Sequence, residues 1–292
     1  MRRNTPCRRR DSLRDKGDAP IVDAHAHIFT RDMPVAREAW HRPDYEFPAQ
    51  QYLDVLDAHG VHFGVIAGIS IYGLYNDYML EQLRRHRRLR GTANVLPSTE
   101  RYILERMKED GIVGVRLQLT RRRELPDLGG EEYQLLLRRL ADLDLHVQLV
   151  VEGHLLPQVL EQLERAGPRI VLDHFGHPDP VKGVNCQGFQ ALLRSVERGR
   201  TWVKLSAGYR LRWSGVGEPV RDPGTRPLAM SLAQSLLQNA GPERLVWGSD
   251  CPFVGYEAAV SFQDTMDDLV EWVPDEALRR KISDTALRLY FS

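Results

Sequence analysis

The sequence has few cysteines, no long apolar run and no excess of charge of either sign. Its cysteines, Cys7, Cys186 and Cys251, lie far apart and form no CxxC pair, which excludes a disulfide framework or a thiolate zinc knuckle and favours a reducing, cytoplasmic setting. No apolar run approaches the roughly 20 residues that span a bilayer, so no membrane partner is expected. Because 40 basic residues balance 40 acidic ones, the overall charge does not indicate nucleic acid as a partner.

The first twenty residues are almost without apolar side chains. They are basic, and they lack the apolar middle region of a secretory signal. We therefore expect residues 1–20 to form a flexible basic tail, with an anion-binding arm as the alternative. The rest of the chain, residues 21–292, is expected to form a single domain, because no low-complexity linker divides it.

From residue 21 onward, short apolar runs rich in β-branched residues alternate with longer segments of helical spacing. Continuous apolar runs of this kind are typical of parallel strands that are buried on both faces. The expected strands cover residues 21–25, 63–67, 91–95, 113–117, 146–150, 169–173, 201–205 and 244–248. Among the helical segments, one has leucine and valine at i, i+3, i+4 and i+7 between residues 156 and 163, and Gly167 follows it.

Eight alternating units in about 270 residues predict an α/β fold, a (β/α)₈ TIM barrel. A doubly wound open sheet is the rival interpretation. An open sheet that binds nucleotides has a glycine-rich phosphate loop after its first strand, whereas this sequence has His25-Ala26-His27 there. The absence of that loop favours the barrel.

Polar residues gather where the expected strands end. Alternate residues of a strand share a face, so Asp23, His25 and His27 point the same way at the end where barrel enzymes place their sites. Two such histidines alone could equally be hydrogen-bonded core residues. Further polar residues fall at equivalent strand ends, and because unpaired charges are costly to bury, their convergence indicates a site rather than scattered loop salt bridges: Arg116, Gln148, Glu152, Asp173, His174 and Asp250.

Three of these strand ends carry motifs of a known family. They are residues 23–27 (Asp-Ala-His-Ala-His), 172–178 (Leu-Asp-His-Phe-Gly-His-Pro) and 247–252 (Trp-Gly-Ser-Asp-Cys-Pro), with support from residues 70–76 and 114–116. Together they resemble the amidohydrolase superfamily (amidohydrolase-related family 2), and within it the branch of 2-pyrone-4,6-dicarboxylate lactonases. The resemblance spans almost everything after the tail.

The resemblance implies a hydrolase that opens a small carboxylated lactone. Asp250 is then the base that activates water, since a free aspartate has a pKa of about 3.9 and is ionised at neutral pH. His25, His27 and His174 are expected to polarise the carbonyl group. The expected substrate-binding residues are arginines, which can clamp carboxylates, and two hydrogen-bonding neighbours: Arg116, Arg122, Arg210, Tyr45 and Ser70.

A metal is the main open question at this site. The same four residues, His25, His27, His174 and Asp250, would also suit zinc or manganese. The fifth expected strand has no histidine or lysine at its centre to complete such a site, and the lactonase branch includes members that work without metal. We therefore expect that no cofactor is required, with one divalent metal as the alternative.

Two other functions remain open on the sequence alone. The first is a metal-dependent decarboxylase of an aromatic or unsaturated acid on the same barrel. The second is a barrel that binds without catalysis. Phe253 stands where the pyrone-dicarboxylate enzymes are expected to have a histidine, which puts that particular substrate in doubt. The sequence leaves the oligomeric state open.

Overall fold

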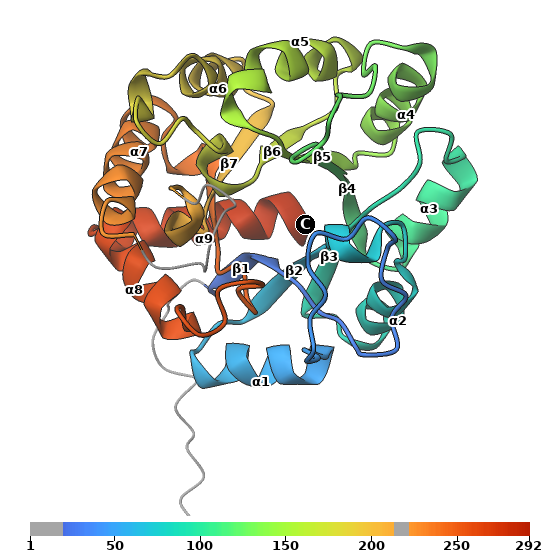
Figure 1. Ribbon diagram of the computed structural model, residues 1–292, viewed down its shortest axis with the longest axis horizontal. Coiled ribbons are helices and arrows are strands. Elements are labelled where there is room, and N and C mark those ends of the chain that lie inside the picture. The colour runs from blue at the N-terminus through green and yellow to red at the C-terminus, as the bar shows by residue number, and fades with distance from the viewer. Residues whose placement is uncertain (1–19, 213–221) are drawn as a thin grey trace, which may run out of the picture.

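The computed structural model describes residues 20–212 and 222–292, so all but one residue of the expected tail lies outside the described part of the chain. Eight strands pair in parallel in the order of the chain. Figure 1 looks along the axis that they surround. Their bounds are β1 (Val22–Ala26), β2 (Phe63–Ala67), β3 (Leu89–Ala93), β4 (Ile112–Gln118), β5 (His146–Val150), β6 (Ile170–Leu172), β7 (Thr201–Ser206) and β8 (Leu245–Gly248).

Backbone contacts just beyond β8 close the sheet against β1. Ala26 and Cys251 form a parallel bridge. On either side of it, the Asp250 amide donates to the His25 carbonyl at 2.8 Å and the His27 amide donates to the Cys251 carbonyl at 2.7 Å. The prediction of a single-domain TIM barrel is confirmed, because an open doubly wound sheet would have no such closure.

Helices surround the barrel and bury apolar side chains on the faces that they turn towards the strands. In α5, the buried stripe is Leu156, Val159, Leu160 and Leu163, and the helix ends at Gly167, whose φ of 81° is easily reached only by glycine. The ring of helices in Figure 1 consists of α1 (Ala49–Ala58), α2 (Asp77–Arg85), α3 (Arg101–Glu109), α4 (Glu131–Asp142), α5 (Leu156–Ala166), α6 (Gln187–Glu197), α7 (Thr225–Asn239) and α8 (Phe262–Trp272).

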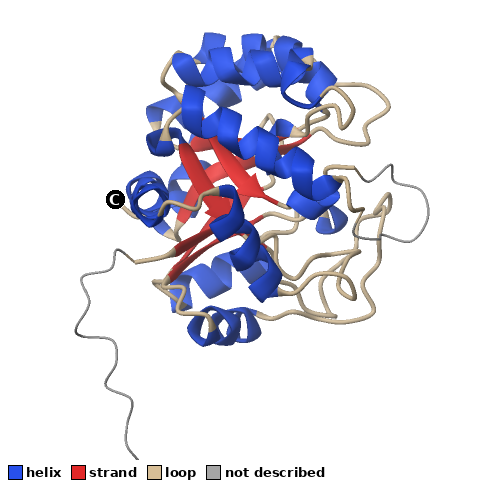
Figure 2. Ribbon diagram, turned by 90° about the vertical axis from the view of Figure 1, so that its left-hand side faces the viewer, coloured by secondary structure: helices blue, strands red, loops and turns tan. Residues whose placement is uncertain are grey.

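The last helix, α9 (Glu276–Tyr290), covers the end of the barrel at which the strands begin. Figure 2 shows it at that end, with the longer loops at the opposite end. Its Ala286, Leu289 and Tyr290 pack against inward-facing residues of four strands, which are Ala24, Val65, Val171 and Val246. The barrel floor is therefore mainly apolar and is covered by α9. No helix in the described residues is long and apolar enough to cross a membrane.

Candidate active site

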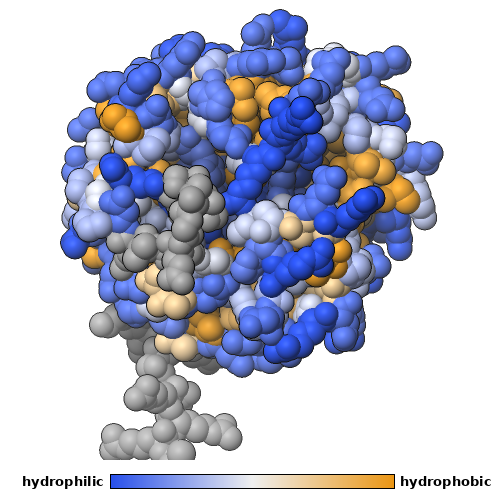
Figure 3. Space-filling view, viewed as in Figure 1, coloured by the Kyte–Doolittle hydropathy of each residue, from blue (hydrophilic) through white to orange (hydrophobic). Residues whose placement is uncertain are grey.

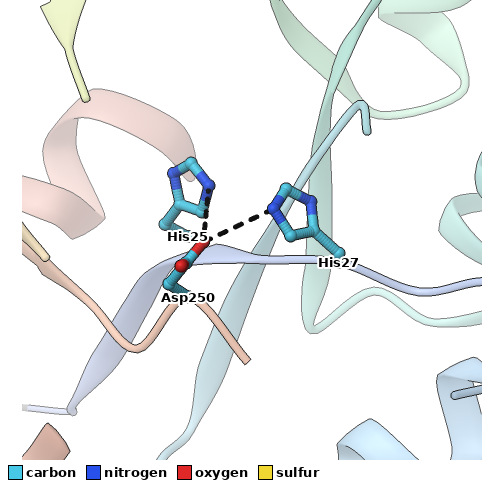
Figure 4. Close-up of side chains that lie close together, drawn as sticks. All are labelled: His25, His27 and Asp250. Atoms are coloured by element: carbon cyan, nitrogen blue, oxygen red, sulfur yellow. Dashed lines mark ion pairs between the residues drawn. The ribbon is translucent and has the colours of Figure 1, made fainter. Parts of the chain in front are cut away.

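The carboxyl end of β1 places two histidines around one carboxylate. His25 Nε2 and His27 Nε2 each lie 3.5 Å from Oδ1 of Asp250, as Figure 4 shows. Asp250 follows β8 and has a φ of 67°, a left-handed conformation that aspartate tolerates better than most residues. Asp23 fixes the turn before it, because its carboxylate accepts hydrogen bonds from the Ser249 amide at 2.8 Å and the Ser249 hydroxyl at 2.6 Å.

A third imidazole approaches the same oxygen from the end of β6. His174 Nε2 lies 3.9 Å from Asp250 Oδ1, and its Nδ1 is 2.8 Å from the Ser206 hydroxyl at the end of β7. The four residues that the sequence singled out as catalytic therefore converge on one point. Their chemical roles stay predictions.

Each of the three imidazoles is held through Nδ1 and directs Nε2 towards Asp250. His27 Nδ1 donates to the Ala67 carbonyl at 2.8 Å, and His25 Nδ1 lies 3.2 Å from Asp173 Oδ1. In a neutral ring with its hydrogen on Nδ1, Nε2 carries a lone pair. His25 Nε2 is buried without a hydrogen-bond partner in the described structure.

The other oxygen of Asp250 is anchored by two donors. The Tyr209 hydroxyl and Arg210 Nε each donate to Oδ2 at 2.7 Å. Burial by itself would raise the pKa of Asp250, but the charge of Arg210 holds the pKa well below its usual range. Asp250 is therefore ionised at neutral pH and is a weak acceptor of protons.

Two of the histidines, His25 and His174, are neutral because the effect of burial on their pKa values outweighs that of the neighbouring carboxylates. Burial lowers the pKa of His25 to about 3, although Asp173 opposes the shift. Burial likewise lowers the pKa of His174 well below its ordinary value, against the charge of Asp250. At neutral pH both rings therefore offer lone pairs and hydrogen-bonding groups rather than positive charge.

Beneath the histidines, Asp173 is the centre of a buried polar layer. The sequence placed Asp173 and Gln148 at the site but gave neither residue a role. Lys204 Nζ lies 3.4 Å from Asp173 Oδ1 and 3.2 Å from His25 Nδ1. Gln148 Nε2 donates to both oxygens of Asp173, at 2.9 and 3.0 Å. Burial lowers the pKa of Lys204 to about 8, an effect that Asp173 opposes. This layer fixes the orientation of His25 from below.

The site opens into a cavity of about 360 Å³ at the carboxyl ends of the strands. Its wall includes His27, His174 and Asp250, together with Arg116, Arg121, Arg210 and Ser70. In the space-filling view of this face, the middle is hollowed and bordered by strongly hydrophilic residues (Figure 3). The cavity is large enough for a small organic acid.

The expected substrate-binding residues occupy different places. Arg116 lines the cavity, but it also donates through Nε to Asp173 Oδ2 at 3.0 Å and through Nη1 to the Gly68 carbonyl at 2.7 Å. Arg210 lines it while bound to Asp250. Ser70 lines it and accepts a hydrogen bond from Trp40 Nε1 at 3.1 Å.

Two of the expected residues lie outside the wall of this cavity. The Tyr45 hydroxyl donates to Glu257 at 2.7 Å, and Arg122 Nε donates to the Gln118 carbonyl at 2.8 Å. Arg121 lines the cavity in place of Arg122, and its guanidinium carbon lies 4.1 Å from the centre of a Trp40 ring. Arg121 and Arg122 are consecutive, so the sequence alone did not show which of them faces the cavity; the backbone at Arg121 has a φ of 59°.

The barrel and its histidine–aspartate site define the class of protein. The amidohydrolase family profile matches residues 22–291, and the chain belongs to this family and is an enzyme of the hydrolase type. It is 30% identical to a 4-sulfomuconolactone hydrolase of Rhizobium radiobacter, over 92% of this chain and 89% of the relative. It is 28% identical to a 2-pyrone-4,6-dicarboxylate hydrolase of Comamonas testosteroni, over 94% and 90% respectively.

Solved structures agree with the family. A probable 2-pyrone-4,6-dicarboxylic acid hydrolase from Acinetobacter baumannii, with citric acid bound, superposes with a TM-score of 0.86 at 30% identity, over 92% of this chain and 98% of the other. A 2,6-dihydroxybenzoate decarboxylase from Rhizobium has the same fold, with a TM-score of 0.66 at 14% identity. The latter likeness shows the fold alone.

The expectation that no cofactor is required is wrong. His25, His27 and Asp250 offer ligand atoms that all lie within 4.8 Å of one another. An amidohydrolase of the same fold from Burkholderia multivorans, 18% identical with a TM-score of 0.78, holds zinc. The missing histidine or lysine on β5 does not exclude a metal here, because this ligand group comes from β1 and the turn after β8.

The residues fit a divalent ion physically. Two ligand atoms that are each about 2.1 Å from a tetrahedral ion lie about 3.4 Å apart, close to the 3.5 Å from each histidine Nε2 to Asp250 Oδ1. Histidine ligands of metals typically have the other ring nitrogen held by a carboxylate or carbonyl group. Asp173 and the Ala67 carbonyl supply those partners for His25 and His27.

Proposed function

We propose that this protein hydrolyses a small lactone that carries carboxylate groups. The observation that carries the proposal is the convergence of His25, His27, His174 and Asp250 on one cavity whose wall also holds arginines. Relatives at 28–30% identity that hydrolyse lactones support this reaction. The decarboxylase alternative has support only from a fold relative at 14% identity.

Arginines give the cavity its preference for anions. Arg116, Arg121 and Arg210 contribute guanidinium groups to the wall, against the carboxylates of Glu152 and Asp250. Guanidinium groups bind carboxylates through paired, charge-assisted hydrogen bonds. Citric acid in a relative at 30% identity supports a substrate with several carboxylates.

In the proposed reaction, water adds to the lactone carbonyl carbon, the ring C–O bond breaks, and a proton reaches the departing oxygen. Asp250 accepts a hydrogen bond from the water and receives its proton. We assign His174 to the carbonyl oxygen, because the Ser206 hydroxyl can donate to Nδ1 and leave Nε2–H free to donate. Loss of one such donor typically costs on the order of 3 kcal/mol of activation free energy.

His25, His27 and Asp250 would hold one divalent ion, zinc or manganese, through lone pairs that face one another. Such an ion polarises carbonyl groups and lowers the pKa of water to about 7. This chemistry compensates for the weak basicity of Asp250, which Arg210 holds ionised. The Ala67 carbonyl orients the His27 ring, and Asp173 orients the His25 ring.

A screen of carboxylated lactones, with and without chelator, tests the proposal. We expect ring opening of at least one lactone, about one equivalent of zinc or manganese in the purified protein, and loss of activity on chelation that added metal restores. Release of carbon dioxide from an aromatic acid, with no lactone opened, would support the decarboxylase instead. No turnover of any compound would support a barrel that only binds.

Site variants test the assignment of roles. Asp250→Asn and His27→Asn should each lower kcat/KM by at least about a hundredfold on the best lactone, because each removes a charge or lone pair that the site needs. The matched controls are Asp142→Asn, at the end of α4, and His86→Asn, just after α2, which should keep wild-type rates. Full activity in both site variants, with folding intact, would overturn the assignment.

A further inference from the structure

A second cavity, the outer chamber, adjoins the catalytic cavity. It has a volume of about 820 Å³. The two spaces meet, because six residues line both of them, namely Trp40, Ser70, Arg116, Gln118, Thr120 and Arg121. Within the described structure, His27, His174 and Asp250 line the catalytic cavity but not the outer chamber. The outer chamber therefore adjoins the reacting groups without contributing any of them.

A stacked pair of side chains stands where the two spaces meet. The Arg121 guanidinium carbon lies 4.1 Å from the centre of a Trp40 ring, a distance at which a cation is attracted to the ring face. The pair is fixed at both ends, because Trp40 Nε1 donates to the Ser70 hydroxyl at 3.1 Å and the Arg121 amide donates to Glu152 Oε1 at 2.8 Å. Both members of this stack line both spaces, so the stack forms part of the boundary between them.

The outer chamber combines apolar surface with positive charge. Leu74 and Leu96 line it and are each about half exposed. Its charged lining residues are four arginines and two glutamates, so positive charge prevails: Arg116, Arg121, Arg122, Arg123, Glu38 and Glu124. Of these, Arg122 and Arg123 line the outer chamber and not the catalytic cavity. This lining suits a group that is apolar along its length and anionic at its tip.

We propose that the outer chamber binds a second anionic group of the substrate, carried on a short apolar arm that extends from the lactone ring past the Trp40–Arg121 stack. The inference rests on the proposed lactone hydrolysis and narrows its substrate class. The preferred substrate has one carboxylate on the ring, within reach of the catalytic cavity's arginines, and another carboxylate or sulfonate at the end of the arm.

Binding of ring-opened acids tests the outer chamber independently of turnover. The probes are the acids formed from two 2-pyrone carboxylates that differ in one respect: the second carboxylate sits directly on the ring or at the end of a propyl arm. Titration calorimetry of the purified protein should give a Kd about tenfold lower for the acid with the arm, because one charge-assisted hydrogen bond contributes about that much.

Variants of the outer chamber distinguish binding in that chamber from binding in the catalytic cavity. Arg123→Gln and Leu96→Gln should each reduce the advantage of the arm to about threefold or less and leave the Kd of the compact acid unchanged. The matched control is Arg200→Gln, an exposed arginine just before β7 at the opposite end of the barrel, which should change neither Kd. Equal affinity for the two acids in the wild type, failure of both to bind, or an advantage that survives both chamber variants would overturn the inference.

Turnover of the two parent lactones separates this inference from the proposed function. Hydrolysis of the compact lactone, with no preference for the arm in binding, would overturn the outer chamber alone. A tighter Kd for the arm, with neither lactone nor any other opened, would overturn lactone hydrolysis and retain the anion-binding chamber.

Discussion

Asp250 uses its two carboxylate oxygens differently. Oδ1 faces the three histidines, at 3.5 to 3.9 Å, whereas Oδ2 accepts hydrogen bonds from Tyr209 and Arg210. Because Oδ2 is anchored, rotation of the carboxylate is restricted and Oδ1 is kept at the point where the imidazoles meet. Tyr209 is thus a positioning residue that acts through Asp250.

Removal of the Tyr209 hydroxyl tests this positioning. Tyr209→Phe should lower kcat/KM by about tenfold, because a hydrogen bond to a charged group contributes about 1.5–3 kcal/mol and Arg210 still holds Oδ2. Loss in kcat with little change in KM is expected, since the anchor orients a reacting group rather than binding substrate. Steady-state kinetics and thermal unfolding of the variant provide the measurement.

Tyr290→Phe is the matched control. The Tyr290 hydroxyl is buried at the barrel floor, without a hydrogen-bond partner in the described residues. Its removal should leave kcat/KM unchanged and keep or raise Tm, because an unsatisfied buried hydroxyl is costly. Equal kinetics for Tyr209→Phe and wild type would show that Arg210 alone positions Asp250.

The direction of a side chain could be predicted from the sequence where the alternation of a strand decides it. The alternation of β1 predicted that His25 and His27 share a face, and the strand ends predicted that Asp250 would meet them. Loop conformation decides the rest, which periodicity does not reach. Arg121 lines the cavity and Arg122 does not, and Arg121 has a left-handed backbone conformation that strand periodicity does not predict. The metal expectation failed because it required a ligand from β5.

At the scale of elements, strand order and helix stripes were predictable, and strand ends less so. β3 spans Leu89–Ala93, two residues earlier than the expected 91–95. The charged residue Arg90 interrupts the apolar run at the start of this strand, so the pattern placed the strand too late in the sequence. In the structure, Arg90 pairs with Val65 of β2. Asn94, expected inside the strand, instead donates through its side chain to the Gly73 carbonyl at 2.9 Å.

The contact between β1 and β8 tolerates only glycine at position 248. A Cβ atom on Gly248 would lie 2.5 Å from the Cβ of His25 and 2.8 Å from its backbone nitrogen. Gly248→Ala should therefore lower the free energy of unfolding by about 1–3 kcal/mol through overpacking. It should also displace His25 and reduce kcat/KM on the order of 10- to 100-fold.

Gly129→Ala is the control for Gly248→Ala. Gly129 is exposed in a loop, and the nearest atom to an added Cβ, Asp127 Oδ1, is an ordinary 3.4 Å away. Urea unfolding and kinetics of both variants provide the measurement. A Gly248→Ala protein with wild-type stability and rate would mean that β1 and β8 can move apart without disturbing the site.

At the scale of the whole molecule, stability depends on pH through buried histidines. Burial lowers the pKa of His146, which opens β5 near the barrel floor, to about 3, and Lys204 adds to the shift. Burial also lowers the pKa of His177 to about 4. Asp23 acts in the opposite sense, because burial raises its pKa to about 6. The wild-type curve is a sum of these contributions, so a single variant is needed to isolate one.

His146→Gln isolates the contribution of His146. The unfolded histidine has a pKa of about 6.5, so between that value and the folded pKa of about 3 the unfolded chain binds the extra proton. The contribution of a neutral His146 is therefore complete above pH 6.5 and is lost as the pH falls towards 3. Its slope is on the order of 1 kcal/mol per pH unit.

Urea unfolding of wild type and His146→Gln between about pH 4.5 and 6.5 measures this difference. The wild type should lose more stability on acidification than the variant, even if the variant is less stable at pH 7. Val147→Ala, at the next buried position of β5, is the control: it removes packing without removing a titrating group, so its curve should run parallel to the wild type. A parallel curve for His146→Gln as well would mean that His146 is protonated equally in the folded and unfolded chains. The folded protein would then accommodate a protonated His146 near the barrel floor, although burial of His146 is expected to disfavour the charged ring.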